Sequence, residues 1–127
     1  MESAYRPVSE NRPLRVAVVG PCAAGKSTLI ARLREAGYEG RHVAQEHSYV
    51  QDMWQRITKP DVLIYLDVTY EAQHQRRRVT WGPEWLAKQS ERLTHARQHC
   101  DLYIATDPLT ADEVAAQVLT FLSHWST

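Results

Sequence analysis

The residues Gly20, Gly25, Lys26 and Ser27 have the types and the spacing needed to bind a phosphate group. They belong to the segment Gly20 to Thr28, which fits the pattern G-x-x-x-x-G-K-[ST]. Two glycines let a backbone curl so that its N–H groups converge on phosphate oxygens, and a following helix adds its positive end. The lysine of this pattern reaches the β- and γ-phosphates, and the next hydroxyl is placed for Mg²⁺. The segment therefore predicts a nucleoside triphosphate site.

We expect most of this segment to contact the nucleotide. The predicted contact residues are Gly20, Cys22, Ala23, Ala24, Gly25, Lys26, Ser27 and Thr28. Lys26 is also a candidate catalytic residue, and Ser27 a candidate Mg²⁺ ligand. A helix N-terminus can lower the pKa of a nearby thiol, but we interpret Cys22 as a small residue that fills the loop.

The surrounding sequence places this segment between a strand and a helix. The run Leu14 to Val19 lacks polar alternation, which is typical of a parallel strand covered on both faces. After the segment, Leu29, Ile30 and Leu33 share one helix face, and Gly37 ends that helix. A strand before and a helix after form the context that a phosphate-binding loop requires.

The rest of the chain continues the alternation of strands and helices. We expect strands at 41–46, 61–68 and 102–105, and helices at 50–57, 70–78, 83–99 and from 110 onward. Thr110 and Glu113 predict a capping box for the last helix. The alternation favours an α/β fold of three layers, with a parallel sheet of about four strands between helices. Ligands of such sheets bind beyond the carboxyl ends of the strands.

Composition limits the class of protein. The chain has 127 residues, 43% hydrophobic content and a formal net charge of zero. We expect a flexible leader at 1–13 and a single domain at 14–127. Zero net charge gives no reason to expect nucleic-acid binding, and no segment approaches the length of a membrane span. Cys22 and Cys100 form neither a disulfide framework nor a zinc spacing, so we expect a cytoplasmic protein. Its edge strands could pair between subunits in a homodimer.

Two acidic residues compete for the metal and base roles that phosphoryl transfer requires. Glu46 ends the strand expected at 41–46, which we place beside the strand that leads into the loop. Asp67 ends the apolar run of the strand at 61–68, which matches the Walker-B pattern. Because a metal-linked carboxylate must lie next to the loop, strand position favours Glu46, and both residues stay candidates for Mg²⁺.

Three adjacent arginines, Arg76, Arg77 and Arg78, follow the strongest predicted strand by one helix. Neighbours on a helix point about 100° apart, so at least one of the three should face the cleft. An arginine above transferring phosphates stabilises the charge of the transition state. We therefore regard all three as candidate catalytic residues, with a solvated basic face as the alternative.

Three other patterns are weaker. One consists of Glu91, His95 and His99, which share a helix face but lack a fourth zinc ligand. His42 and His47 flank Glu46, and we do not predict a metal site there. Thr58 to Asp61 resembles the guanine-reading motif [NT]-K-x-D of GTPases, but it precedes a strand instead of following one. We therefore do not expect a GTPase.

The chain resembles the P-loop kinase superfamily in a shortened form, especially the deoxynucleoside and thymidylate kinases. The matching segments are Gly20 to Thr28, Pro60 to Val68 with Glu71 and Arg76 to Arg78, and Asp101 to Asp107 with Leu109, Thr110, Glu113 and Val114. The resemblance implies a P-loop NTPase fold, ATP with Mg²⁺, and an arginine lid at Arg76, Arg77 and Arg78. It also implies that adenine rests near the loop Thr106-Asp107-Pro108, so Asp107 and Pro108 become nucleotide contacts. Glu46 then stands where these kinases carry an acidic base.

The chain also departs from this family. Only Glu39 to Pro60 lies where these kinases build the acceptor site, and Gln45-Glu46-His47-Ser48 replaces the D-R or E-R-S signature. The leading hypothesis is an ATP-dependent kinase that phosphorylates a nucleoside, a nucleotide or another small hydroxylated acceptor. The alternative is a nucleotide-binding module with weak or no catalysis that acts through a protein partner.

Overall fold

The computed structural model describes residues 12–77 and 81–125 of the chain, so the leader predicted at 1–13 falls mostly outside the described residues, as does Arg78. The elements in chain order are β1 (Arg15–Val19), α2 (Lys26–Glu35), β2 (Glu39–His42), the 3₁₀ turn η1 (Gln45–His47), α3 (Met53–Thr58), β3 (Val62–Asp67), α4 (Tyr70–Arg76), α5 (Pro83–Arg92), α6 (Thr94–His99), β4 (Leu102–Ala105) and α7 (Ala111–Ser123).

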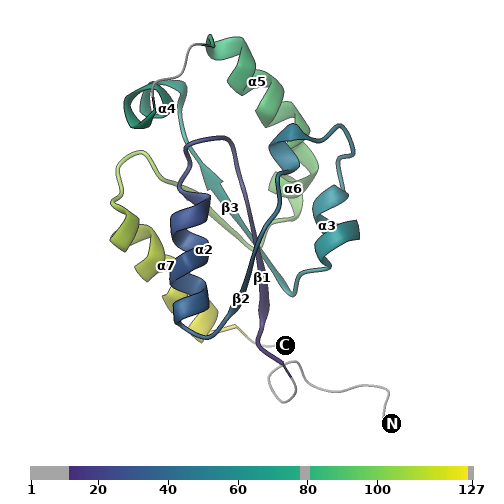
Figure 1. Cartoon of the computed structure of the whole chain (residues 1–127), viewed down its shortest axis with the longest axis vertical. Helices are drawn as coiled ribbons and strands as arrows, with labels where there is room; N and C mark the ends of the chain where they lie inside the picture. The colour runs from purple at the N-terminus through teal and green to yellow at the C-terminus, as the bar shows by residue number, and fades with distance from the viewer. Residues whose placement is uncertain (1–11, 78–80, 126–127) are drawn as a thin grey trace.

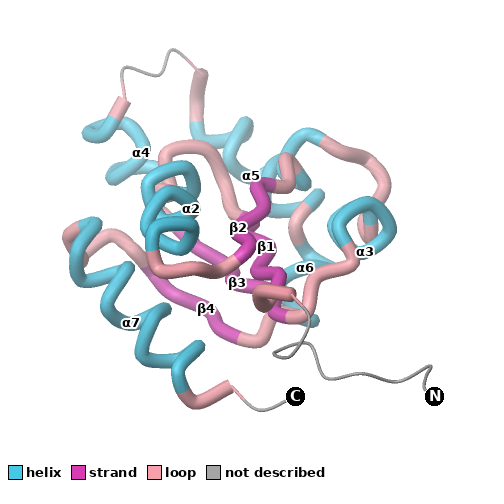
Figure 2. The backbone as a smooth tube through the Cα atoms, turned by 60° about the horizontal axis from the view of Figure 1, so that its bottom comes forward, coloured by secondary structure: helices cyan, strands magenta, loops and turns pink. Residues whose placement is uncertain are grey.

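The four strands form one parallel sheet in the order β2-β1-β3-β4. Helices α2 and α7 cover one face, and α3, α5 and α6 lie on the other (Figures 1 and 2). The predicted α/β architecture, a four-stranded parallel sheet flanked by helices, is therefore confirmed. The carboxyl ends of the strands point toward the top of Figure 1, where the connection from β1 to α2 lies.

The core explains why the central strands read as apolar runs instead of alternating patterns. Successive side chains of a strand point to opposite faces, and both faces of β1 and β3 are buried under helices. One apolar cluster includes Val16, Val18, Leu29, Leu33 and Val118, on the side of α2 and α7. The other includes Ala17, Val19, Trp54, Tyr65 and Leu93, on the side of α3 and α6.

The predicted strand at 41–46 is wrong in its extent. β2 ends at His42, and Gln45–His47 form a 3₁₀ turn, so Glu46 follows the strand instead of ending it. The buried side chain of Gln45 accepts a hydrogen bond from the backbone N–H of Trp54 and donates one to the carbonyl of Val50. These contacts with the chain leading into α3 turn this segment away from the sheet.

The predicted helix at 83–99 divides into α5 and α6 at Leu93. Leu93 is fully buried in the cluster on the α6 side of the sheet. Its N–H donates to the carbonyls of both Gln89 and Ser90, which tightens the end of α5. The bend lets both short helices pack against the rest of the fold, which a single straight helix pattern did not predict.

Asp61 lies at the amino end of β3, at the opposite end of the sheet from the β1–α2 connection. Its carboxylate accepts hydrogen bonds from the guanidinium of Arg12 and from the N–H of Arg15, each at 2.8 Å. The segment Thr58 to Asp61 therefore lies at the amino end of the sheet, away from the glycines after β1, as expected from its place before a strand.

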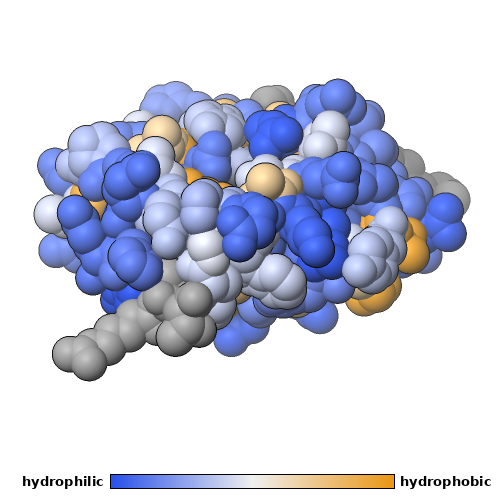
Figure 3. Space-filling model, turned by 90° about the horizontal axis from the view of Figure 1, so that it is seen from above, coloured by the Kyte–Doolittle hydropathy of each residue, from blue (hydrophilic) through white to orange (hydrophobic). Residues whose placement is uncertain are grey.

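The surface at the carboxyl end of the sheet is largely hydrophilic. Figure 3 views this end from above Figure 1, and its hydrophobic residues form only small patches between polar ones. No helix within 12–77 and 81–125 is both long enough and apolar enough to span a bilayer.

Candidate functional site

The glycine loop, residues 20–25, joins β1 to α2 through backbone conformations that side chains tolerate poorly. Gly20 has φ 154°, and a Cβ built there would lie 2.0 Å from the carbonyl oxygen of Leu66. Ala23 and Gly25 are left-handed, with φ 66° and 95°. Gly25 is the N-cap of α2, and no side chain within residues 12–77 and 81–125 caps this helix. The loop therefore lies tightly against β3 and leads directly into the positive end of a helix.

Two buried glutamines hold Cys22 in this loop. The Cys22 N–H donates to Gln89 Oε1 at 3.1 Å, and Gln73 Nε2 donates to the Cys22 carbonyl at 2.8 Å. Gln89 Nε2 also lies 3.2 Å from Cys22 Sγ. Neither glutamine is predicted from the sequence, because they come from α4 and α5 and belong to no motif. Their burial in the middle of polar helices is visible only in the structure.

Lys26 is buried at the first turn of α2 and is 7% exposed. Its ammonium donates to the carbonyls of Gly20 and Pro21, at 2.5 and 3.0 Å, and to Glu46 Oε2 at 2.8 Å. Glu46 is 3% exposed, so the two charges form a buried ion pair. The second oxygen, Glu46 Oε1, is buried without a hydrogen-bond partner among the described residues.

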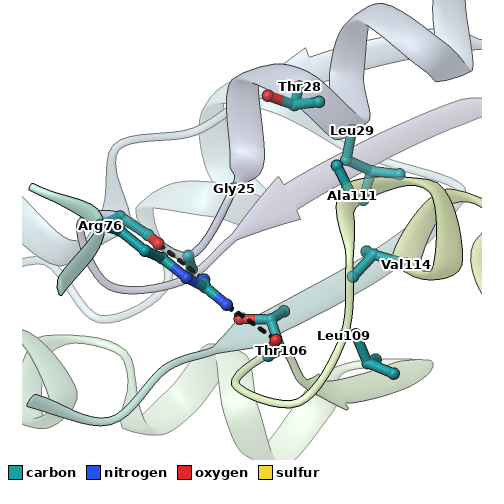
Figure 4. Close-up of a pocket in the computed structure, with 10 residues that line it drawn as sticks. Gly25, Thr28, Leu29, Arg76, Thr106, Leu109, Ala111 and Val114 are labelled. Carbon is teal, nitrogen blue, oxygen red and sulfur yellow. Dashed lines mark hydrogen bonds between the residues drawn. The ribbon is translucent and has the colours of Figure 1, made fainter. Parts of the chain in front are cut away.

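Arg76 links the glycine loop to the chain after β4. Its guanidinium donates to the carbonyl of Ala23 at 3.0 Å, and to the hydroxyl and carbonyl of Thr106 at 3.0 and 2.8 Å (Figure 4). Arg77 lines a cavity that Lys26 also lines, which is described below as the second cavity. Two of the three predicted arginines therefore reach the loop region, while Arg78 lies outside the described residues.

A first cavity, of about 220 Å³, opens between the glycine loop, α2, α4 and the connection from β4 to α7. Figure 4 shows Thr28, Leu29, Arg76, Thr106, Leu109, Ala111 and Val114 around it. The predicted contacts Asp107 and Pro108 do not line it. Asp107 instead accepts hydrogen bonds from the N–H and hydroxyl of Thr69. Burial raises the pKa of Asp107, but these bonds outweigh burial and lower it overall. Of the loop at 106–108 only Thr106 lines the cavity, together with the next residue, Leu109.

A second cavity, of about 380 Å³, lies on the other side of the loop. It is lined by Cys22, Ala23, Ala24, Gly25, Lys26, Ser27, Thr28, His42, Ala44, Glu46, His47, Arg76 and Arg77. Burial, followed by the charge of Lys26, lowers the pKa of His42. Most charged groups on this lining are cationic, and Glu46 is its carboxylate.

The structure does not bring Asp67 to either cavity. Strand position does not separate the two acidic candidates, because both β2 and β3 pair with β1. The side-chain contacts do separate them. The Asp67 carboxylate accepts hydrogen bonds from the N–H of Val68 and the hydroxyl of Tyr103 on β4. Burial and this bond raise the pKa of Tyr103 to about 12. Glu46, not Asp67, shares the second cavity with Ser27.

The helical histidines occupy a different part of the fold. His95 and His99 stack with ring centroids 4.1 Å apart, and His95 Nδ1 accepts a hydrogen bond from Trp54 Nε1 at 3.1 Å. Through these contacts both rings pack against their neighbours. The two histidines therefore belong to the contact between α3 and α6.

The second cavity combines groups that could bind an anion with one that could accept a proton. Lys26, Arg76 and Arg77 supply positive charge, the uncapped start of α2 adds its dipole, and Glu46 supplies a carboxylate. Both cavities meet at the glycine loop, so one elongated ligand could occupy both. No model of a known protein family matches the chain, and no curated protein matches its sequence significantly.

Proposed function

We propose that this chain is a shortened kinase of the P-loop superfamily, which binds ATP with Mg²⁺ and transfers the γ-phosphate to a small hydroxylated acceptor such as a nucleoside or a nucleotide. One observation carries the proposal. A buried lysine lies at the junction of a strained glycine loop and an uncapped helix, beside a buried carboxylate, and lines the second cavity.

The loop provides the phosphate site in this proposal. Among the described residues no side chain caps α2, so its first N–H groups are available to phosphate oxygens. Lys26 would exchange the carbonyls of Gly20 and Pro21 for phosphate oxygens, which are stronger partners because they are charged. The adenine ring of ATP would enter the first cavity, beside Thr106 and Leu109.

The residues present also fit a magnesium ion. Ser27 and Glu46 line the same cavity, and hydroxyl and carboxylate oxygens are ligands that Mg²⁺ accepts. The unpartnered Glu46 Oε1 is a buried acceptor of this kind. Bound Mg²⁺ would neutralise charge on the β- and γ-phosphates.

The transfer step would use Glu46 as the base. The acceptor hydroxyl gives its proton to the Glu46 carboxylate, while its oxygen bonds to the γ-phosphorus. The bond from that phosphorus to the β–γ bridging oxygen breaks, and ADP leaves with the electron pair. Arg76 and Arg77 would stabilise the charge that develops on the transferring group. A positioned base typically contributes about 10²–10⁴-fold to such a rate.

A second candidate is a nucleotide-binding module with weak or no catalysis that acts through a protein partner. Two observations favour it. Lys26 already has three partners, one of them Glu46, so the proposed base is engaged. Between β2 and β3 the chain forms only η1 and the short helix α3, which leaves little structure to hold an acceptor.

The test is a transfer assay with labelled ATP, Mg²⁺ and a pool of nucleosides, nucleotides and small alcohols. The proposal expects labelled product from the natural chain and none from Lys26→Ala. Removing Lys26 alone leaves a buried carboxylate unpaired, which costs about 3–5 kcal/mol. The double variant Lys26→Ala with Glu46→Gln removes both charges and serves as the folded control, verified by thermal melting.

The outcomes separate the candidates. Product that depends on Lys26 supports a kinase. Tight ATP binding without transfer to any acceptor in the pool supports the module. Absence of both binding and transfer would exclude both candidates.

A further inference from the structure

Three potential metal ligands from two distant segments meet beside the glycine loop. Cys22 Sγ lies 3.9 Å from His47 Nε2, and His47 Nε2 lies 3.8 Å from Glu46 Oε2. One ligand atom from each of the three residues falls within 4.8 Å of the other two. Cys22 comes from the loop after β1 and the other two from η1, so the fold creates this group.

The spacing is close to that of a tetrahedral zinc site. Zinc binds sulfur at about 2.3 Å and nitrogen or oxygen at about 2.0–2.2 Å, which separates neighbouring ligand atoms by about 3.4–3.6 Å. The distances from His47 Nε2 to Cys22 Sγ and to Glu46 Oε2 exceed this by a few tenths of an ångström, and the third pair of ligand atoms lies within 4.8 Å. His47 is half-exposed, so a small rotation of its ring can close the difference.

The carboxylate supplies an independent indication of a ligand. Glu46 is 3% exposed and lines the second cavity, and its Oε1 has no partner within the described ranges. A buried polar atom without a partner is costly, and bound cations are among the groups that satisfy such atoms. Lys26 occupies Oε2, so Oε1 can bind a cation without breaking the ion pair.

Neighbouring side chains also form hydrogen bonds with two of the ligand residues. Gln89 Nε2 donates to Cys22 Sγ, and Lys26 donates to the Glu46 carboxylate. Outer hydrogen bonds of this kind fix the orientation of metal ligands. A thiolate and an imidazole together select Zn²⁺ over Mg²⁺, which prefers oxygen ligands.

We propose that Cys22, Glu46 and His47 form a binding site for Zn²⁺, with the fourth coordination position open to the second cavity. Binding replaces the proton of the Cys22 thiol by the metal, so one proton is released for each ion bound. The ion would lie in the cavity assigned above to phosphates and would engage the proposed base. Zinc at this site would therefore oppose nucleotide binding.

The test is a titration of the metal-free full chain with Zn²⁺ alone, in competition with a chromophoric chelator, together with absorption spectra of the Co²⁺-loaded chain. We expect one equivalent of tightly bound metal and a thiolate-to-cobalt charge-transfer band. His47→Gln should weaken binding by more than about tenfold, since outer-shell losses alone cost about 10–100-fold. Cys22→Ser should weaken it similarly and abolish the band.

Matched controls use the same residue types elsewhere in the fold. Cys100→Ser and His99→Gln should leave both affinity and spectrum unchanged. Because the His47 side chain is 51% exposed, its variant should fold even if the Cys22 variant does not. Absence of stoichiometric binding, or binding unaffected by His47→Gln, would overturn the proposal. The titration contains no nucleotide, so its result is independent of the kinase proposal.

Discussion

Lys26 and Glu46 form a buried ion pair, and in the proposed reaction the two partners have different roles. Both side chains are less than one-tenth exposed, and the ammonium also reaches two loop carbonyls. Such a pair fixes the positions of both groups, because breaking it from one side leaves an uncompensated charge. In the proposed reaction the pair would keep Glu46 near the loop until a phosphate binds Lys26.

The variant Glu46→Gln should separate binding from transfer. It removes the competing anion from Lys26 and keeps an amide of the same shape, so ATP affinity measured without Mg²⁺ should stay the same or increase. Loss of the base should lower the transfer rate by about 10²–10⁴-fold. Calorimetric affinity and single-turnover rates measure the two effects. Unchanged transfer would remove Glu46 from the mechanism.

Arg76 and Arg77 offer a second test at the scale of single residues. Arg76 bonds to Ala23 and Thr106 across the end of the first cavity, and Arg77 lines the second. Replacing both by alanine should lower turnover by about 10²–10³-fold, with a smaller loss of ATP affinity. Arg56→Ala on α3, which removes an exposed pair with Asp52, is the matched control. Equal losses in turnover and affinity would instead indicate a role in binding alone.

The glycine loop is an element whose shape depends on close packing against β3. A side chain at Gly20 would overlap the carbonyl of Leu66, and the φ of Gly20 is itself rarely adopted by other residues. Gly37, after α2, also has a positive φ, but a Cβ there meets nothing within 4 Å. Replacing either glycine therefore costs conformational energy, and only at Gly20 does the new side chain also overlap a neighbouring atom.

The variants Gly20→Ala and Gly37→Ala should differ strongly in stability. We expect a loss of more than about 3 kcal/mol for Gly20→Ala, from strain and overlap together. Gly37→Ala should lose only about 1–2 kcal/mol. Chemical denaturation measures both free energies of unfolding. Similar losses would show that the loop does not need its close approach to β3.

Elements with strong local signals could be predicted from the sequence. The apolar runs of β1 and β3 and the capping box of Thr110 and Glu113 were found correctly, because neighbouring residues determine them. The course of the chain around Glu46 was not, since the buried contacts of Gln45 with the chain near α3 determine it. Gln73, Gln89 and the approach of Cys22 to His47 likewise depend on tertiary packing.

At the scale of the whole molecule, the two ends of the sheet differ in structure. The carboxyl end carries the glycine loop and both cavities beside it, whereas ion pairs connect the segments at the amino end. There, Asp61 receives hydrogen bonds from Arg12 and from the start of β1. Burial raises the pKa of Asp61, but these donors outweigh burial and lower it overall.

This shift predicts how stability depends on pH. Because the pKa of Asp61 is lower in the folded chain than the unfolded value of about 3.9, the contact stabilises the fold above about pH 4. That stabilisation is lost as the pH falls through the lowered pKa of the folded state. Asp61→Asn should therefore lose roughly 1–2 kcal/mol at neutral pH. The free energies of unfolding of the natural chain and of the variant, measured as a function of pH, should converge in acid. A constant difference between them down to pH 2 would contradict the assignment.

The central claim, that the glycine loop and Lys26 bind a nucleoside triphosphate, is tested most directly by isothermal titration calorimetry of the natural chain with ATP, with and without Mg²⁺. We predict saturable binding of one nucleotide that is lost when Lys26→Ala is combined with Glu46→Gln in a chain that still melts cooperatively. No heat of association at millimolar ATP under either condition, or equal binding by that double variant, would contradict the account.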